Sequence, residues 1–262
     1  MLSFLIGPNP PRFPEIAMRR IFSPLAALLL FVTLPAVAGE VEDKRANEAS
    51  RVLGEVLRIP EESIPANLLE EAQAVAVIPS VIKVGFVVGG RRGRGLIAIR
   101  GSDGTWSHPS FITLTGGSFG FQAGVQGTDV ILVFRTTRGV DSIVNGKFTL
   151  GADASVAAGP VGRTAQASTD AQLKASIYSY SRARGLFAGV ALDGTHLGID
   201  NKSNQAVYGK GNTARAIFEG RAGSGSDAVV GFRDKLEEST VKQGPEPAPA
   251  PAPTPATTAP AK

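Results

Sequence analysis

Residues Tyr178–Gly189 read YSYSRARGLFAG, and the run GADASVAAGPVGR at Gly151–Arg163 precedes them. Both runs are dense in Gly, Ala and Ser, with arginines and aromatic residues at a few places. Small residues at this density let backbones and sheets approach closely. Neither run holds the Ser/His/Asp or Cys/His content of a catalytic centre, so both indicate packed sheet rather than chemistry.

Short apolar runs punctuated by glycine surround these two stretches and predict a sheet. Most of the 31 glycines fall among them, which favours a twisted, bulged and mostly antiparallel sheet over a βαβ fold. We therefore predict an α+β fold with a Gly-rich sheet or sandwich. The expected strands are Val75–Ile78, ended by Pro79, and Gly95–Arg100, Phe111–Thr115, Phe119–Val125, Val130–Phe134, Lys147–Val156, Ser176–Tyr180, Leu186–Leu192 and His196–Asp200.

Helices are expected mainly before the sheet. Residues 41–58 place apolar side chains on one face at spacings of three and four, and their polar face mixes both charge signs. That pattern favours a helix packed on the sheet over a basic helix lying on a membrane. A second short helix follows Pro65, and 212–218 predicts a last one.

The two ends of the chain predict targeting and a tail. Residues 18–38 combine a basic start, a short apolar run and an A-x-A site, which indicates a signal peptide cleaved after Ala38. A retained membrane anchor is the alternative reading, although Pro24 and Pro35 interrupt the apolar run. We interpret 1–17 as an over-extended start, 41–220 as the domain, 221–243 as a C-terminal extension and 244–262 as a disordered Pro/Ala-rich tail. Export to the periplasm or cell envelope is expected.

The amino-acid composition excludes several classes of site and partner. The 262 residues include no cysteine, which excludes disulfides, thiolate metal sites and a lipoprotein anchor. A formal net charge of +4 and 6% aromatic residues are too little to predict nucleic-acid binding.

Matches to catalytic and cofactor motifs are weak. Residues 116–120 fit G-x-S-x-G, but that motif needs a strand, a sharp turn and a helix, and strands are expected here. The G-x-G-x-x-A match at 93–98 fails on the same ground. Asp193, His196 and Asp200 are better read as turn and surface residues than as metal ligands. We expect no cofactor, no metal and no enzymatic activity.

A cluster of basic residues is the best candidate for a ligand site. Arg91, Arg92 and Arg94 fall in a Gly-rich segment read as a loop, with Lys83 before it and Arg100 after it. Guanidinium groups on such a loop can hold phosphate oxygens, and a solvated hairpin tip is the equal alternative. A second basic candidate is formed by Arg182 and Arg184, while Phe86 and Phe187 are candidates for either an acyl boundary or the core.

Several segments in order resemble the SYLF family over about residues 45–220. They are Ile78–Phe86, the glycine-arginine segment, Trp106–Phe111, Gly120–Val130, Gly151–Arg163 and Tyr178–Gly189. The resemblance implies a phospholipid-binding module, in a family whose yeast members also bind actin and whose bacterial members are mostly exported.

An exported protein meets neither actin nor, ordinarily, phosphoinositides, so actin is not an expected partner. We expect a non-enzymatic periplasmic module for anionic phospholipid, with phosphatidylglycerol or cardiolipin as the ligand. The alternative is a structural or interaction component of the cell envelope, with an envelope protein as partner and the Pro-rich tail as its tether.

Overall fold

The computed structural model describes residues 39–58, 63–146, 148–162, 174–183 and 186–240, without the side chains of 85–88 and 118–126. The predicted start, signal segment and tail lie outside these residues. The helices are α1 Glu40–Leu57, α2 Ala66–Glu70, α3 Arg138–Val144, α5 Asn201–Tyr208, α6 Ala214–Phe218 and α7 Asp227–Thr240. The strands are β1 Ala74–Ile99, β2 Ser110–Phe134, β3 Phe148–Thr149, β4 Val156–Ala158, β5 Ile177–Ala183, β6 Leu186–Gly189 and β7 Thr195–Ile199. This mixture of sheet and helices confirms the α+β prediction.

Strands β1 and β2 form one long antiparallel ribbon of 26 and 25 residues, from the pair Ala74–Phe134 to the pair Ile97–Ser110. The prediction that Pro79 ends the first strand is wrong. Pro79 and Ser80 sit in a bulge between Ile78 and Val81, where Ser80 has a φ of 50°. The Ser80 amide donates to Asp129 Oδ1 at 3.0 Å. A bulge bends the ribbon without interrupting it.

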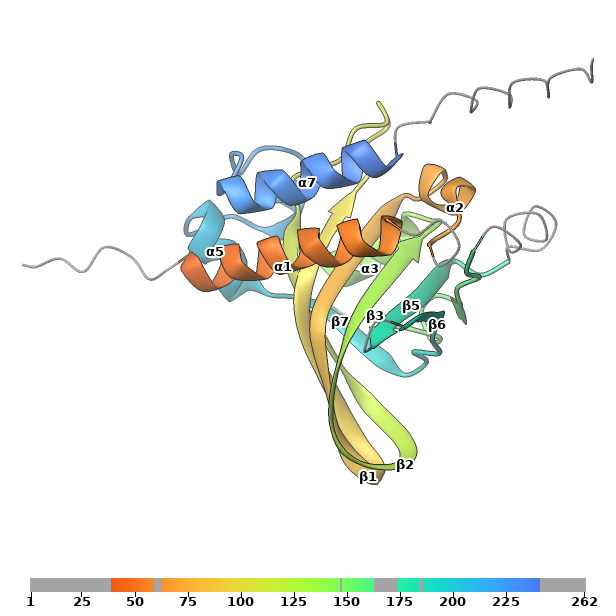
Figure 1. The fold of residues 1–262 in the computed structure, drawn as a ribbon. Coiled ribbons are helices and arrows are strands. Elements are labelled where there is room, and N and C mark those ends of the chain that lie inside the picture. Colours follow the sequence, from red (N-terminus) through yellow and green to blue (C-terminus); the bar gives the residue numbers. More distant parts are fainter. Residues whose placement is uncertain (1–38, 59–62, 147, 163–173, 184–185, 241–262) are drawn as a thin grey trace, which may run out of the picture. The chain divides into compact units, whose positions relative to one another are not determined.

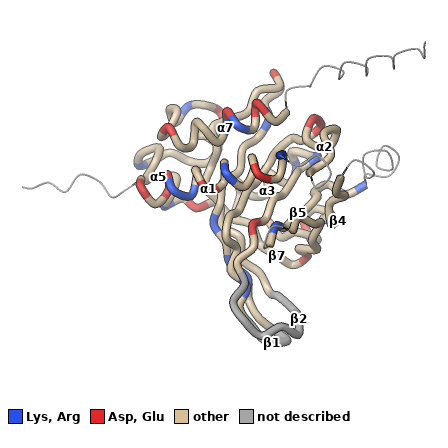
Figure 2. Tube along the Cα trace, in the orientation of Figure 1, with Lys and Arg blue, Asp and Glu red and all other residues tan. Residues whose placement is uncertain are grey.

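The ribbon folds back on itself, so that β1 runs outward and returns beside its own beginning (Figure 1; Figure 2 follows the same path as a tube). Gly95 makes this return possible, because a Cβ there would lie 2.1 Å from the Val77 carbonyl oxygen. Gly93 is similarly tight, with an added Cβ 2.6 Å from Ile78 Cγ2. A second register shift lies between Gly85 and Val87.

The rest of the sheet is attached through strands that pair with the two halves of β2. Strand β7 pairs with Ile112–Gly116 and β5 pairs with Asp129–Phe134, both antiparallel. The path of the sheet is β3-β7-β2-β5-β4, with β1 also on β2 and β6 also on β5. Only the β4–β5 pairing is parallel among the described strands, which agrees with the mostly antiparallel sheet expected from the glycine pattern.

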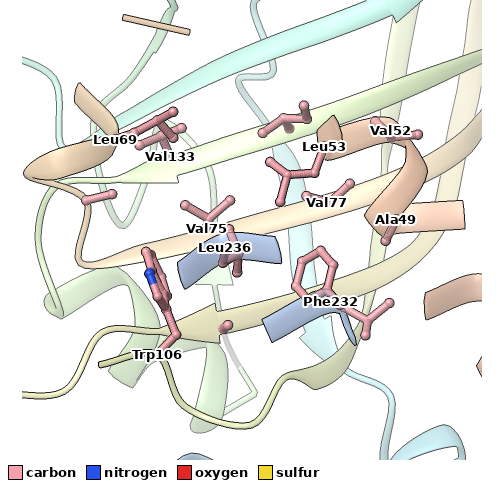
Figure 3. Packing of buried hydrophobic residues seen from close by; sticks show 14 of the residues in the cluster. Ala49, Val52, Leu53, Leu69, Val75, Val77, Trp106, Val133, Phe232 and Leu236 are labelled. Carbon is pink, nitrogen blue, oxygen red and sulfur yellow. The ribbon is translucent and has the colours of Figure 1, made fainter. Parts of the chain in front are cut away.

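Two apolar clusters fill the fold. One lies within the folded sheet and includes Ile78, Ile97 and Phe148. The other lies between the sheet and helices α1, α2 and α7, where Leu53 of α1 and Phe232 of α7 pack over the sheet (Figure 3). The predicted packing of the N-terminal helices on the sheet is therefore present, and α7 joins them although the sequence analysis placed 221–243 in an extension.

The run YSYSRARGLFAG forms β5 and β6, which explains its small residues. The Tyr180 ring is fully buried and stacks on Phe187, with centroids 5.2 Å apart. An added Cβ on Gly159 would lie 2.0 Å from that ring, and the Ser179 hydroxyl donates to the Ala157 carbonyl at 3.1 Å. Phe187 thus packs against the core, one of the two roles expected for it.

Candidate anion-binding groove

A groove of about 520 Å³ lies between helix α1 and the folded-back part of β1. Its lining holds four basic side chains, Lys44, Arg45, Arg92 and Arg94, and one acid, Glu48. A second depression of about 440 Å³ runs along the outer face of α1, but its lining includes Glu40, Asp43 and Glu48 and does not suit an anion. The first groove is therefore the candidate site.

The fold-back of β1 builds this groove. It carries Arg92 and Arg94 back beside Pro79, Ser80 and Ile82 of the outgoing half, which line the same groove. Arg92 and Arg94 lie two residues apart on one strand and so share a face. Gly93 between them turns toward the outgoing half, where no side chain would fit.

The prediction of an arginine loop is wrong. The three arginines belong to strand β1, where Arg91, Arg92 and Arg94 pair with Gly116, Thr115 and Thr113 of β2. Strand alternation sends Arg91 to the other face. Its Nε donates to the Gly117 carbonyl at 3.1 Å, and burial lowers the pKa of its guanidinium. The three arginines therefore do not converge on one ligand, and only Arg92 and Arg94 reach the groove.

Arg45 has a structural place at the inner end of the groove. Its Nη1 donates to Ser203 Oγ at 3.1 Å and lies 3.8 Å from Asp200 Oδ2, and its guanidinium stacks 5.6 Å from the centre of the Phe111 ring. Burial lowers the pKa of Arg45, although Asp200 opposes that effect. These contacts tie α1 to α5 and to the sheet.

Asp200 is shared between two cations. Its carboxylate caps α5 by accepting from the Ser203 amide at 3.2 Å, and its Oδ2 also lies 3.9 Å from Arg94 Nε. The carboxylates of Glu42 and Glu48 also act on Arg45, so the acids at this end of the groove offset the charges of Arg45 and Arg94.

Lys44 and Arg92 are the side chains with the most freedom to meet a ligand. Both are exposed, and neither makes a hydrogen bond or ion pair with any residue that the structure describes. Lys44 was missed in the sequence analysis because it lies 48 positions before Arg92. The available signal was its place on α1, on the polar side away from the buried residues Ala46 and Ala49.

The other predicted basic residues do not line the groove. Arg100 donates to the Glu70 carbonyl and stacks 4.8 Å from the centre of the Trp106 ring, and burial lowers its pKa. Arg182 forms an ion pair with Glu55 of α1. Lys83 lies further out on β1, while Arg184 and the Phe86 side chain are outside the described residues.

The weak catalytic and metal motifs lie in regular structure. Ser118 pairs with Gly89 within the ribbon, and residues 93–98 belong to β1, so neither motif stands between a strand and a helix. His196 lies on β7 and Asp200 caps α5. Within the described ranges, no three His, Cys, Asp or Glu side chains are grouped closely enough to hold a metal ion.

Among the residues that the structure describes, no helix is both long enough and apolar enough to cross a membrane.

Comparison with known proteins gives matches to one family. The model of the family described as Ysc84, Las17-binding protein actin regulator, matches residues 115–238. LAS seventeen-binding protein 3 of Saccharomyces cerevisiae is 39% identical over 161 residues, which is 60% of this chain and 35% of that protein. Human SH3 domain-containing YSC84-like protein 1 is 36% identical over 169 residues, 62% of this chain and 49% of that protein.

The chain thus spans between about a third and a half of the length of these relatives. The matches confirm the predicted resemblance to the Ysc84, or SYLF, family. The matched range includes most of α7, in keeping with the packing of that helix on α1. The family description names an actin regulator and binding protein rather than an enzyme.

Proposed function

We propose that this chain is a non-enzymatic module that binds anionic phospholipid through the groove between α1 and β1. The observation that carries the proposal is the pair Lys44 and Arg92, two exposed cations that line one groove and have no ion-pair partner among the described residues. Arg94 and Arg45 both lie within ion-pair distance of Asp200, and Arg45 holds the helix in place.

The chemistry of the groove suits a phosphate diester. An arginine fork can hold two phosphate oxygens together, and a lysine adds a flexible point charge. Near an anionic bilayer each basic residue contributes about 1 kcal/mol. A signal peptide at 18–38 would deliver the chain to the periplasm, where phosphatidylglycerol and cardiolipin are the anionic lipids we expect it to meet.

Co-sedimentation with vesicles tests the proposal. The full chain is mixed with phosphatidylglycerol or phosphatidylcholine vesicles at low and high salt, and the variant Lys44→Ala/Arg92→Ala is compared with wild type. Loss of two contributions of about 1 kcal/mol should weaken binding to the anionic vesicles by roughly 30-fold. Salt should weaken wild-type binding too, because the Debye length falls from about 10 Å at 0.1 M to about 3 Å at 1 M.

The matched control is Lys210→Ala/Arg215→Ala, which removes the same charge from two exposed positions outside the groove. It should bind nearly as wild type does. Equal losses in both double variants would mean that net charge matters and the groove does not. Equal binding to neutral vesicles would remove the case for an anionic headgroup.

Protein binding is the second candidate, and the family description favours it because the name concerns binding to Las17 and regulation of actin. For an exported chain the corresponding partner would be an envelope protein, with 244–262 as its tether. Deletion of 244–262 separates the two candidates. Vesicle binding should survive the deletion if the groove binds lipid, whereas retention in the envelope fraction should fail if the tail is the tether.

A further inference from the structure

The outer end of the ribbon carries apolar side chains that the core does not cover. Ile82 and Val84 are 48% and 51% exposed, whereas Val81 just before them is buried. Ile82 and Val84 lie two residues apart on one strand and therefore share a face. The ribbon thus leaves the core after Val81 with an apolar face open to its surroundings.

The pairing explains this exposure. We define the free end of the ribbon as its outer bend, residues 82–90 and 117–128 near the middle of both strands, where β1 and β2 pair only with each other among the described strands. Ile82 stands opposite Gly127, which has no side chain to cover it. An added Cβ on Gly127 would meet no atom within 4 Å, so close packing does not explain this glycine.

The charges of the free end are mostly basic. Between Ala72 and Thr128 the chain holds a single acid, Asp103, in the turn far from the free end, and Asp129 follows directly at its base, where its Oδ1 accepts from the Ser80 amide. Lys83, Arg91 and Arg92 belong to the outer part of the ribbon, and Figure 2 shows blue segments along it where it leaves the helices. An apolar end flanked mainly by cations is complementary to an anionic bilayer, where negative headgroups surround an apolar interior.

The apolar face is also continuous with the candidate groove. Ile82 lines that groove together with Lys44 and Arg92, and the half-exposed Val41 lines it from α1. A lipid held by its phosphate at Lys44 and Arg92 would thus have its acyl side toward Ile82 and Val84. An exposed apolar patch rimmed by polar residues is a common mark of a membrane interaction site.

We propose that the free end of the ribbon enters the acyl-chain boundary of an anionic bilayer through Ile82 and Val84, while Lys44 and Arg92 hold headgroups outside it. The inference rests on the proposed function and adds a mode of attachment to it. Binding then has two parts, an electrostatic part that salt removes and an apolar part that salt leaves in place.

A site-specific probe can test insertion, since the chain has no cysteine and one introduced thiol is a unique label. An environment-sensitive fluorophore is attached in the full chain at Val84→Cys, and separately at Leu186→Cys as the matched control. Leu186 is 75% exposed and lies on β6. With phosphatidylglycerol vesicles, the probe at 84 should shift to the blue and be quenched by lipids that carry a quencher on the acyl chain. The probe at 186 should do neither.

A second variant measures the contribution to binding. Ile82→Ser/Val84→Ser should weaken the binding that remains at high salt by about tenfold or more. In wild type, insertion removes the exposed half of each aliphatic side chain from water, and the variant loses that contribution. Both positions are exposed, so the far-UV circular dichroism spectrum should match that of wild type.

The outcomes separate this inference from the proposed function. Sedimentation with anionic vesicles but no shift and no acyl-chain quenching at position 84 would overturn insertion and leave lipid binding intact. No sedimentation at all would overturn both. A shift at 84 that rises with protein concentration in the absence of vesicles would overturn insertion in favour of pairing between two copies of the chain.

Discussion

Gly95→Ala should be among the most damaging single-methyl additions in this protein. The new Cβ would lie 2.1 Å from the Val77 carbonyl oxygen and 2.6 Å from the Ile78 Cα, both backbone atoms of the outgoing half of β1. Overpacking usually costs 1–3 kcal/mol, and backbone atoms cannot move aside as the end of a side chain can. We therefore expect a loss of about 3 kcal/mol or more in the free energy of unfolding.

Two other glycines of the ribbon provide graded controls. At Gly93 the nearest atoms belong to the side chains of Ile78 and Val81, so Gly93→Ala should cost about 1–3 kcal/mol. At Gly127 nothing lies within 4 Å, so Gly127→Ala should be neutral or should stabilise by up to about 1 kcal/mol. None of the three has a positive φ, so the space available is the difference between them.

Thermal and denaturant unfolding measure the series, with Trp106 as a built-in probe because it is the chain's one tryptophan and is buried. A loss of about 3 kcal/mol in a domain of this size lowers Tm by about 6–12 °C. Val81→Ala should partly rescue Gly93→Ala in a double-mutant cycle and should do nothing for Gly95→Ala. If Gly95→Ala unfolds like Gly127→Ala, the two halves of β1 do not meet as described.

Two further predictions concern an ion pair and a histidine. In a double-mutant cycle, Arg182→Ala and Glu55→Ala should show a coupling free energy of about 1 kcal/mol or less in stability. Arg182→Ala should leave vesicle binding unchanged. A large loss of vesicle binding would instead place Arg182 in the lipid site. Burial, and to a smaller extent the charge of Arg233, lowers the pKa of His108 below its ordinary 6.5. As the pH falls, the unfolded chain therefore binds a proton at this histidine more readily than the folded chain does. The free energy of unfolding should decrease as the pH drops below about 6.5. Between pH 7 and 5.5 the fall in Tm should be smaller in His108→Gln, and an identical pH dependence in both proteins would contradict the assignment.

The spacing of apolar residues along the sequence predicts the helices that bury one face against the sheet. Residues 41–58 place Ala46, Ala49 and Leu53 at helical spacing, and all three are fully buried in α1. The same argument was available for α7, where Val229, Phe232 and Leu236 fall three and four residues apart and are also buried. That helix could therefore have been found from the sequence.

The ribbon could not be predicted in the same way, because its decisive contacts are not local. A proline within an apolar run ordinarily ends a strand, yet Pro79 lies in a bulge. Gly93 and Gly95 look like turn residues in sequence, and only the return of β1 against Ile78 shows why no side chain fits there. The candidate groove shares this difficulty, since Lys44 and Arg92 meet only after α1 has packed on the sheet.

The partners of each cation decide which basic residues can serve a ligand. Arg45 and Arg182 already have carboxylate partners, so a phosphate at either would have to compete with Asp200 or Glu55 for the cation. Lys44 and Arg92 have no ion pair with any described residue to give up to a phosphate, and they lie where the apolar face of Ile82 begins. The arrangement therefore assigns separate tasks to cations that look alike in the sequence, with some holding α1 to the sheet and others left available to an anion.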